Sequence, residues 1–186
     1  MASNAVNLGI GAATGMFFHA PAGTALPAYP TEALGNDWAE VGFISQDGIT
    51  WHHGRSAEPL KDWSNSIRRQ LQSDATGTVA APIISTTNEV LETIFGASNV
   101  TAAAATTAHG ALDSVKVQEG VVSGKEAFLF LMKDGDDTLM LGTTSGVITS
   151  LDDITFAPGS TITWNATVSA DAWTFMKDDG QVVTSP

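Results

Sequence analysis

Short strand-like segments recur through the second half of the chain, and they restrict the fold more than any other feature. Residues 127–132 (AFLFLM) form a continuous apolar run, which is typical of a strand buried on both faces. Residues 133–137 (KDGDD) supply a turn, and residues 138–141 (TLML) run back, so a hairpin is predicted. Residues 160–168 alternate between apolar and polar side chains. Further strands are expected at 113–119, 146–150, 154–156 and 172–176. This spacing predicts a mainly β fold, a sandwich or a barrel.

The first half of the chain is less regular. Residues 38–44 and 49–52 are expected to be strands separated by a tight turn, Gln-Asp-Gly, at 46–48. Residues 53–74 are polar, and Pro59 near their middle argues against one continuous helix. Two extended segments, or a long excursion from the core, fit them better. Residues 97–112 are small and low in complexity, and are expected to be a loop.

One flanking helix is expected at about 86–96. Thr and Asn residues at 86–88 offer N-caps, and Glu89 lies in the first turn, where the helix dipole favours an acid. Gly96 is placed to end the helix. The apolar residues at 90, 91, 94 and 95 share a face, so this short helix must pack on the sheet.

The charge of the chain is strongly unbalanced. It has 186 residues, which fits a single domain over 1–186, and its net charge is −12. Residues 1–54 contain no Lys or Arg, whereas four of the eight basic residues lie close together: Arg55, Lys61, Arg68 and Arg69. An acidic chain repels phosphate backbones, which argues against tight nucleic-acid binding. The charge fits either a soluble acidic protein or a surface that nucleic acid passes without sticking.

Targeting signals are not recognisable in the sequence. No apolar run approaches the roughly 20 residues of a membrane helix, and the N-terminus lacks the pattern of a signal peptide. We therefore expect a protein made and used in a cytoplasm, or carried in a particle assembled there, with no membrane binding.

Gly9, Gly11 and Gly15 are spaced much as in a dinucleotide-binding loop. That fingerprint requires a strand before the loop and a helix after it, but only eight residues precede Gly9 and Pro21 soon follows. The glycines are better explained by flexible, closely packing backbone in an N-terminal arm.

No catalytic constellation is apparent. The chain has no cysteine, no HExxH-type metal motif and no GxSxG motif. The Asp cluster at 134–137 lacks the later Glu of a calcium loop and fits an ordinary hairpin turn. We therefore expect no enzyme activity, no metal and no cofactor.

Trp63 is the most unusual aromatic residue. It lies among polar neighbours and close to Arg68 and Arg69, which is typical of an interface anchor with a charged rim. The alternative is a tryptophan folded back on its own domain. Trp164 and Trp173 lie on expected strands and fit the core.

The motifs also follow a characteristic order: MFFHAPAGTALP (16–27), DWAEVGFISQDGITW (37–51), EPLKDWSNSIRRQLQSD (58–74), TTNEVLETIFGASNVT (86–101), KEAFLFLMKDGD (125–136) and ITWNAT (162–167). In this order they resemble the major tail protein, or tail tube protein, of long-tailed bacteriophages, especially those that infect actinobacteria. The resemblance covers nearly the whole chain.

The resemblance implies a β-sandwich with one flanking helix, whose subunits join edge to edge into hexameric rings that stack into a tube. Such a tube surrounds a tape-measure protein during assembly, meets tail-tip and tail-terminator proteins, and later conducts genomic DNA without binding it specifically. The protein would be a structural part of the virion tail, assembled in the host cytoplasm.

The resemblance also assigns segments. Residues 1–30 would be an arm that orders on assembly, and 46–74 a long loop or extended hairpin that reaches the adjacent ring. Arg55, Lys61, Arg68 and Arg69 would meet acidic side chains there, with Trp63 as anchor. The sequence stops at Pro186, so the extra C-terminal domain of some relatives is not expected.

Two alternatives remain open at this point. One is another β-rich virion component, such as a capsid decoration or tail-terminator protein, and the other is a small non-enzymatic binding module. Tube subunits form rings or polymers, whereas a binding module stays small.

Overall fold

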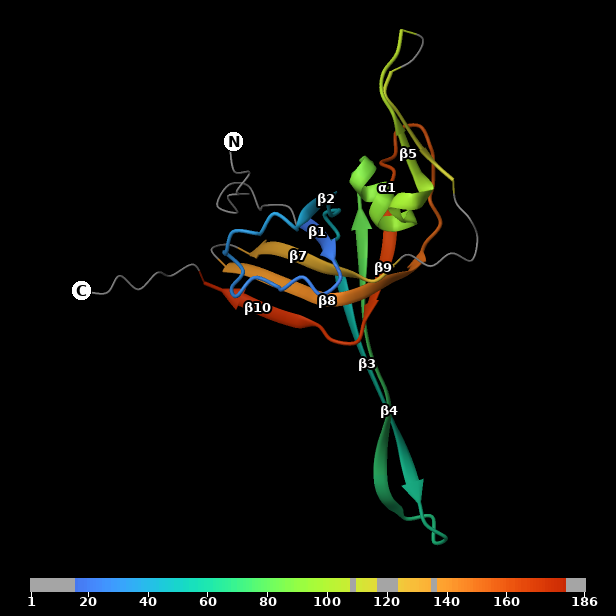
Figure 1. The fold of residues 1–186 in the computed structure, drawn as a ribbon. Helices are drawn as coiled ribbons and strands as arrows, with labels where there is room; N and C mark the ends of the chain where they lie inside the picture. The colour runs from blue at the N-terminus through green and yellow to red at the C-terminus, as the bar shows by residue number, and fades with distance from the viewer. Residues whose placement is uncertain (1–15, 108–109, 117–123, 135–136, 180–186) are drawn as a thin grey trace, which may run out of the picture.

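The computed structural model describes residues 16–107, 110–116, 124–134 and 137–179 (Figure 1). Residues 1–15, which include Gly9, Gly11 and Gly15, lie outside the described residues, so the interpretation of these glycines stays a prediction. The elements in chain order are β1 (Met16–Pro21), β2 (Ala39–Phe43), β3 (Thr50–Lys61), β4 (Ile67–Ile83), α1 (Asn88–Phe95), a 3-10 turn (Ala97–Asn99), β5 (Val100–Ala103), β6 (Leu112–Val115), β7 (Glu126–Asp134), β8 (Asp137–Leu151), β9 (Trp164–Ala170) and β10 (Thr174–Asp178).

Most strands belong to one antiparallel sheet of eight strands. Its order is β2-β1-β7-β8-β9-β4-β3, and β10 pairs with β8 outside this path. Strands β5 and β6 form a separate two-stranded sheet beside α1 (Figure 1). A mainly β fold with one α-helix among the described residues confirms the predicted class.

Strand β8 turns the sheet into a sandwich, because it belongs to both halves. Up to Gly146 it pairs with β7, and from Gly146 onward it pairs with β9. A Cβ atom on Gly146 would lie 3.0 Å from the Phe128 ring and 3.2 Å from Val168. A Cβ atom on Gly142 would lie 2.7 Å from Leu26. The two glycines let the strand cross where other side chains already fill the space.

The main core lies between the two halves of the sheet. Phe17 stacks on Phe130 with ring centroids 4.6 Å apart and on Phe128 at 5.8 Å. Trp164 is buried here, as expected, and its indole N–H donates to the Thr86 hydroxyl at 3.0 Å. Trp173 packs against the same cluster.

A second cluster lies on the opposite face of β1, β7 and β8. Its buried members are Phe18, Leu129, Leu131 and Met140. Residues of the connection between β1 and β2 cover it, among them Leu26, Leu34 and Trp38. Strands β1 and β7 are therefore buried on both faces, which explains the continuous apolar run at 127–132.

The helix forms where the sequence predicts it. The Thr87 hydroxyl accepts from the Val90 N–H at 3.4 Å, and Gly96 at φ 85° ends the helix. Val90, Leu91 and Ile94 are buried, so α1 packs by its apolar face. No helix among the described residues is long and apolar enough to cross a membrane.

Several sequence-based boundaries are wrong. The loop expected at 97–112 contains β5, because Val100 pairs with Val115 of β6 and both pack on the core. The strand expected at 154–156 is irregular: it leads into a turn in which the Ser160 N–H donates to the Ala157 carbonyl and Gly159 has φ 81°. The strands expected at 138–141 and 146–150 are one strand, β8.

Replacing Phe130 tests the importance of the aromatic stack. We expect Phe130→Ala to lower the free energy of unfolding by about 3–5 kcal/mol, because it removes a buried ring from both stacking and packing. Phe175→Ala is the matched control, since Phe175 is 53% exposed. Urea unfolding followed by tryptophan fluorescence measures both. Equal losses from the two variants would contradict the assigned core.

Candidate functional site

The long β3–β4 hairpin is the feature of this fold that departs most from a compact sandwich. The two strands pair from Thr50 opposite Ala80 to Lys61 opposite Ile67. Strand β9 pairs with β4 from Gly77 to Ile83. The part of the hairpin between that region and the turn, toward Lys61 and Ile67, projects from the body as a two-stranded ribbon (Figure 1). The two extended segments expected within 53–74 are therefore the outer parts of β3 and β4.

Asp62 organises the tip of the hairpin. Its Oδ1 accepts from the Ser64 hydroxyl at 2.6 Å, the Ser64 N–H at 2.9 Å and the Ser66 N–H at 3.0 Å. Its Oδ2 accepts from Arg68 Nε at 2.6 Å. Asn65 adopts φ 61°, a conformation that asparagine tolerates better than most residues. The tip is thus a defined turn with its own hydrogen-bond network.

These bonds stabilise the ionised form of the carboxylate. The Ser64 hydroxyl, followed by the Ser66 backbone N–H and the Arg68 guanidinium, lowers the pKa of Asp62 below its ordinary value. A lowered pKa in the folded state means that the network is present at neutral pH and is lost as the pH falls through that pKa. Asp62 is therefore ionised at neutral pH, the form in which it accepts these hydrogen bonds.

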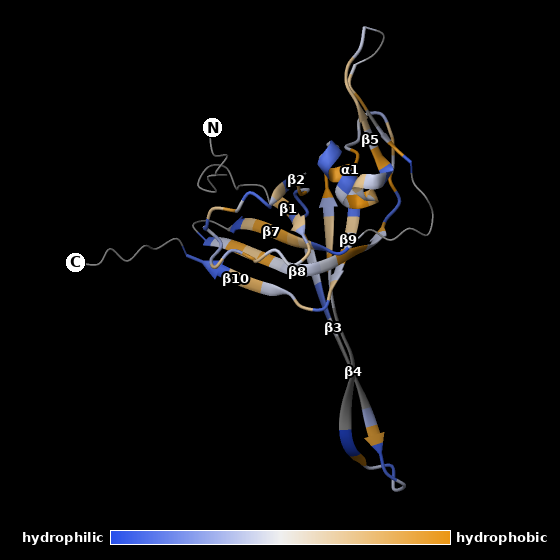
Figure 2. Cartoon of the chain, viewed as in Figure 1, coloured by the Kyte–Doolittle hydropathy of each residue, from blue (hydrophilic) through white to orange (hydrophobic). Residues whose placement is uncertain are grey.

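Large apolar side chains are exposed on this ordered tip. The Trp63 side chain is fully exposed, with a relative accessibility of 105%, and Leu60 and Ile67 are 53% and 57% exposed. Hydrophobic and strongly hydrophilic residues stand together at the end of the hairpin (Figure 2). Exposed apolar groups rimmed by polar ones mark interaction surfaces. The alternative of a Trp63 folded back on its own domain is wrong.

The structure brings most of the expected contact residues together. Lys61, Trp63, Arg68 and Arg69 all lie at the tip and are exposed. Arg55 lies farther back in β3, opposite Ala75. The Arg68 guanidinium forms an ion pair with Asp62 within the tip. No ion pair of Arg69 occurs among the described residues. We call Leu60, Lys61, Trp63, Ile67, Arg68 and Arg69 the tip cluster.

Sequence reasoning missed three members of this arrangement. Leu60 and Ile67 flank the turn, but isolated apolar residues in a polar stretch give no periodic signal. Asp62 is one of the polar residues beside Trp63 in the sequence. Its position two residues before Ser64 is the signal for an Asx-type turn, which could have identified it.

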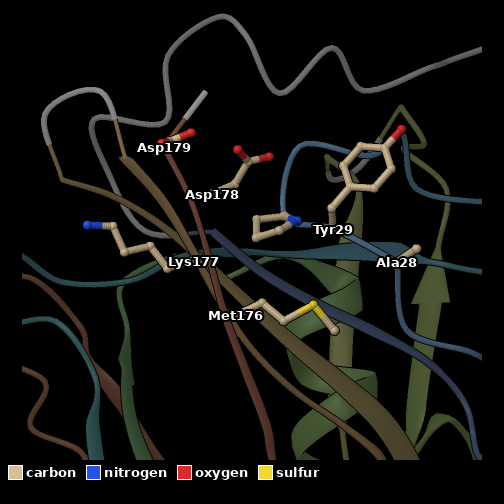
Figure 3. Close-up of a pocket in the computed structure, with 7 residues that line it drawn as sticks. Ala28, Tyr29, Met176, Lys177, Asp178 and Asp179 are labelled. Atoms are coloured by element: carbon tan, nitrogen blue, oxygen red, sulfur yellow. The ribbon is translucent and has the colours of Figure 1, made fainter. Parts of the chain in front are cut away.

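A cavity of about 770 Å³ lies between β10 and residues 28–30 (Figure 3). Tyr29, Met176 and the charged residues Lys177, Asp178 and Asp179 line it. Asp178 accepts from the Thr31 hydroxyl at 2.7 Å, and Lys177 pairs with Asp137 at 2.5 Å. These charges thus hold elements of the fold together. No cluster of three or more metal-ligating side chains occurs in the described part of the chain.

The comparisons with known proteins identify the chain. A family model described as phage tail tube protein matches residues 1–183. The chain belongs to this family. This confirms the resemblance drawn from motif order, while the narrower expectation of an actinobacterial host stays a prediction. The phage tail tube protein family is structural, so the chain is a non-enzymatic component of the virion tail.

Solved structures of injection systems also match the tail tube chain, and no curated protein does. One belongs to an extracellular contractile injection system, the PVC sheath-tube complex in its extended state, with 11% identity, a TM-score of 0.47 and coverage of 95% of this chain and 98% of that chain. Another is the anti-feeding prophage cap, the AFP tube terminating cap, with 11% identity, a TM-score of 0.48 and coverage of 96% and 100%.

A titration of the tip tests the Asp62 network. We expect Ser64→Ala to raise the pKa of Asp62 toward its ordinary value, because the hydroxyl bond to the carboxylate is lost. Ser66→Ala is the matched control: Ser66 donates through its backbone N–H, which the substitution keeps. The measurement is the carboxyl carbon shift of Asp62 by NMR as the pH is lowered. An unchanged pKa in Ser64→Ala would contradict the network.

Proposed function

We propose that this tail tube protein forms hexameric rings that stack into the tail tube, the conduit through which the genome leaves the particle. The tape-measure protein occupies the bore during assembly, and tail-tip and tail-terminator proteins meet the two ends of the tube. Membership of the tail tube family supports the proposal. The observation that carries it is the ordered, exposed tip cluster at the end of a projecting hairpin.

Unpaired strand edges support lateral assembly. Among the described residues, β3 pairs only with β4, and β10 pairs only with β8 in the main sheet. An open edge presents unsatisfied backbone donors and acceptors and invites aggregation. Closure of subunits into a ring gives such edges a partner and ends their growth. We therefore assign the contacts within a ring to the sheet edges.

The hairpin is assigned to the contact between rings. A two-stranded ribbon that projects from the sandwich reaches beyond the body of its own subunit (Figure 1). Its tip carries Trp63, a residue type that dominates many interfaces, together with Lys61 and Arg69 as a charged rim. In this arrangement Arg55 lies on the shaft of the hairpin. The arm expected at residues 1–30 is corrected in part, because Met16–Pro21 forms β1 between β2 and β7 in the sheet of the single subunit. We therefore propose only the residues before Met16 as an arm that orders on assembly.

The charge of the chain fits passage of DNA. At a net charge of −12 per subunit, a ring repels phosphate backbones, so DNA slides along the bore without specific binding. The tip cluster has three basic residues beside one acid, Asp62, and is an exception to the acidic character. Placed between rings, these basic residues stay out of the DNA path.

Electron microscopy tests the assembly directly. We expect the purified full-length protein at high concentration to form hollow tubes or six-fold rings in negative stain. Co-expression with the tail-tip and tape-measure proteins provides an initiator where nucleation is slow. Monodisperse monomers under both conditions would reject the tube and favour a binding module.

Reversal of charge at the tip tests the contact between rings. We expect Arg69→Glu to block tube growth while rings and the fold persist, because it places an acid against an acidic neighbour. Arg69 is the cleaner choice than Arg68, whose replacement would also break the bond to Asp62. Lys125→Glu, at an exposed site in the body, is the control of equal charge change. Normal tubes from Arg69→Glu would exclude the tip from stacking.

A further inference from the structure

An apolar pocket lies at the end of the hairpin opposite to the tip. Its volume is about 430 Å³, and its apolar wall is formed mainly by Ile44, Ile49, Ile84, Phe130 and Met132. Ile84 at its rim is 39% exposed. The turn that leads into β3 forms one side, where the Gly48 N–H donates to the Ser45 carbonyl at 2.9 Å. The pocket is thus built where β3 begins, and the tip where β3 ends.

This placement gives the subunit two different ends. Strand β3 has 12 residues, and at about 3.3 Å per residue it separates the pocket from the tip by roughly 40 Å. A group at one end that fits a hollow at the other makes a head-to-tail contact, which repeats from copy to copy in one direction. Stacked rings require such a contact.

The charges at the two ends are opposite. Asp47 lies in the turn beside the pocket and accepts from the Ser45 hydroxyl at 3.0 Å. Asp47 and Asp152 both line an adjacent hollow, of about 320 Å³, which shares Gly48 with the pocket. Among the residues that stand next in sequence to those lining the pocket, Lys133 is the one that is basic. The acidic turn is thus a match for Lys61 and Arg69 at the tip.

We propose that Trp63 of one subunit occupies this pocket in a subunit of the adjacent ring, with Lys61 and Arg69 facing Asp47 and Asp152. The proposal rests on the stacking of rings proposed above and names the surface that receives the hairpin. Burial of a fully exposed indole in an apolar pocket removes both from water. Leu60 and Ile67 lie against the rim, where Ile84 is exposed.

The chain's own residues 1–15 are the competing occupant, because Met16 lines the pocket. They contain no aromatic side chain and no Lys or Arg. They therefore lack both the large ring that fills an apolar hollow and the positive charge that matches the acidic turn. Trp63 supplies the first and its neighbours the second.

Cysteine cross-linking tests the contact, because the chain has no cysteine of its own. Gln46→Cys with Ser66→Cys places one thiol beside the pocket and one on the tip, and leaves Trp63 intact. Under mild oxidation of assembled tubes we expect a ladder of covalent oligomers on a non-reducing gel. Ser66→Cys with Lys125→Cys, which pairs the tip with an exposed site in the body, is the control and should stay monomeric.

The outcomes separate this inference from the proposed function. Tubes that form normally but give no ladder would overturn the pocket assignment alone and favour residues 1–15 or another occupant. Failure of the unmodified chain to form tubes, even with its initiator, would overturn both proposals. A ladder from the control pair as well would show random collision and would also overturn the assignment.

A mixing experiment provides an independent test. Trp63→Ala removes the inserted group, and Ile84→Arg places a like charge where the basic tip arrives. Each variant alone should need at least about a tenfold higher concentration to form tubes, as expected for loss of a buried tryptophan anchor. When rings of the two variants are mixed, Trp63 of the Ile84→Arg ring can still enter the intact pocket of the Trp63→Ala ring. The other face of each ring has no working contact, so we expect pairs of rings but no tubes. Tyr29→Ala, at a 52% exposed site in the connection between β1 and β2, should polymerise normally. Normal tubes from Trp63→Ala would overturn the inference.

Discussion

The passage of strand β8 from one half of the sheet to the other is the constraint on which the rest of the structure depends. Its first half pairs with β7 and β10, and its second half pairs with β9, which pairs in turn with β4. Phe17, Phe128 and Phe130 stack across the paired strands β1 and β7, and the face that they form is buried because the other half of the sheet lies against it. Gly142 and Gly146 make the crossing possible because neighbouring side chains occupy the space of their missing Cβ atoms. The direction of the projecting hairpin follows from this crossing, through β9 and β4.

The outer hairpin has no core beneath it. Two-stranded ribbons are marginally stable alone, so this one depends on its continuity with the sheet and on the Asp62 network. A chain under selection for solubility alone gains nothing from a fully exposed tryptophan on an ordered turn. An ordered tip also lowers the entropy cost of binding, since the residues that make the contact are already in place. The tip has the properties of a preformed binding element.

The sequence predicts the fold best where local signals and packing agree. Thr87 and Gly96 mark the helix ends correctly, and the apolar run at 127–132 marks the strand buried on both faces. The errors fall where tertiary contacts decide. Within the small residues at 97–112, Val100–Ala103 forms β5 because β6 pairs with it. Residues 154–156 are irregular because they lead into the turn at Gly159.

Part of the tip cluster could be predicted, because it depends on local sequence and on one hairpin. Trp63 and the basic residues stand out by composition, and their grouping at one end requires only that two extended segments pair. The pocket could not be predicted, because it joins residues from β7, from the turn before β3 and from the end of β4. Only the closed sandwich brings these segments together, and no local pattern records that closure.

In the tube proposed above, two non-equivalent ends would also explain how a highly charged subunit builds a long polymer without aggregating. Each subunit carries a net charge of −12, so free subunits repel one another. In the proposed hexameric ring, six tips would meet six pockets at once, and the first contact would raise the effective concentration of the others. On this proposal stacking becomes strong only after rings have closed, so repulsion between free subunits would confine growth to the axis of the tube.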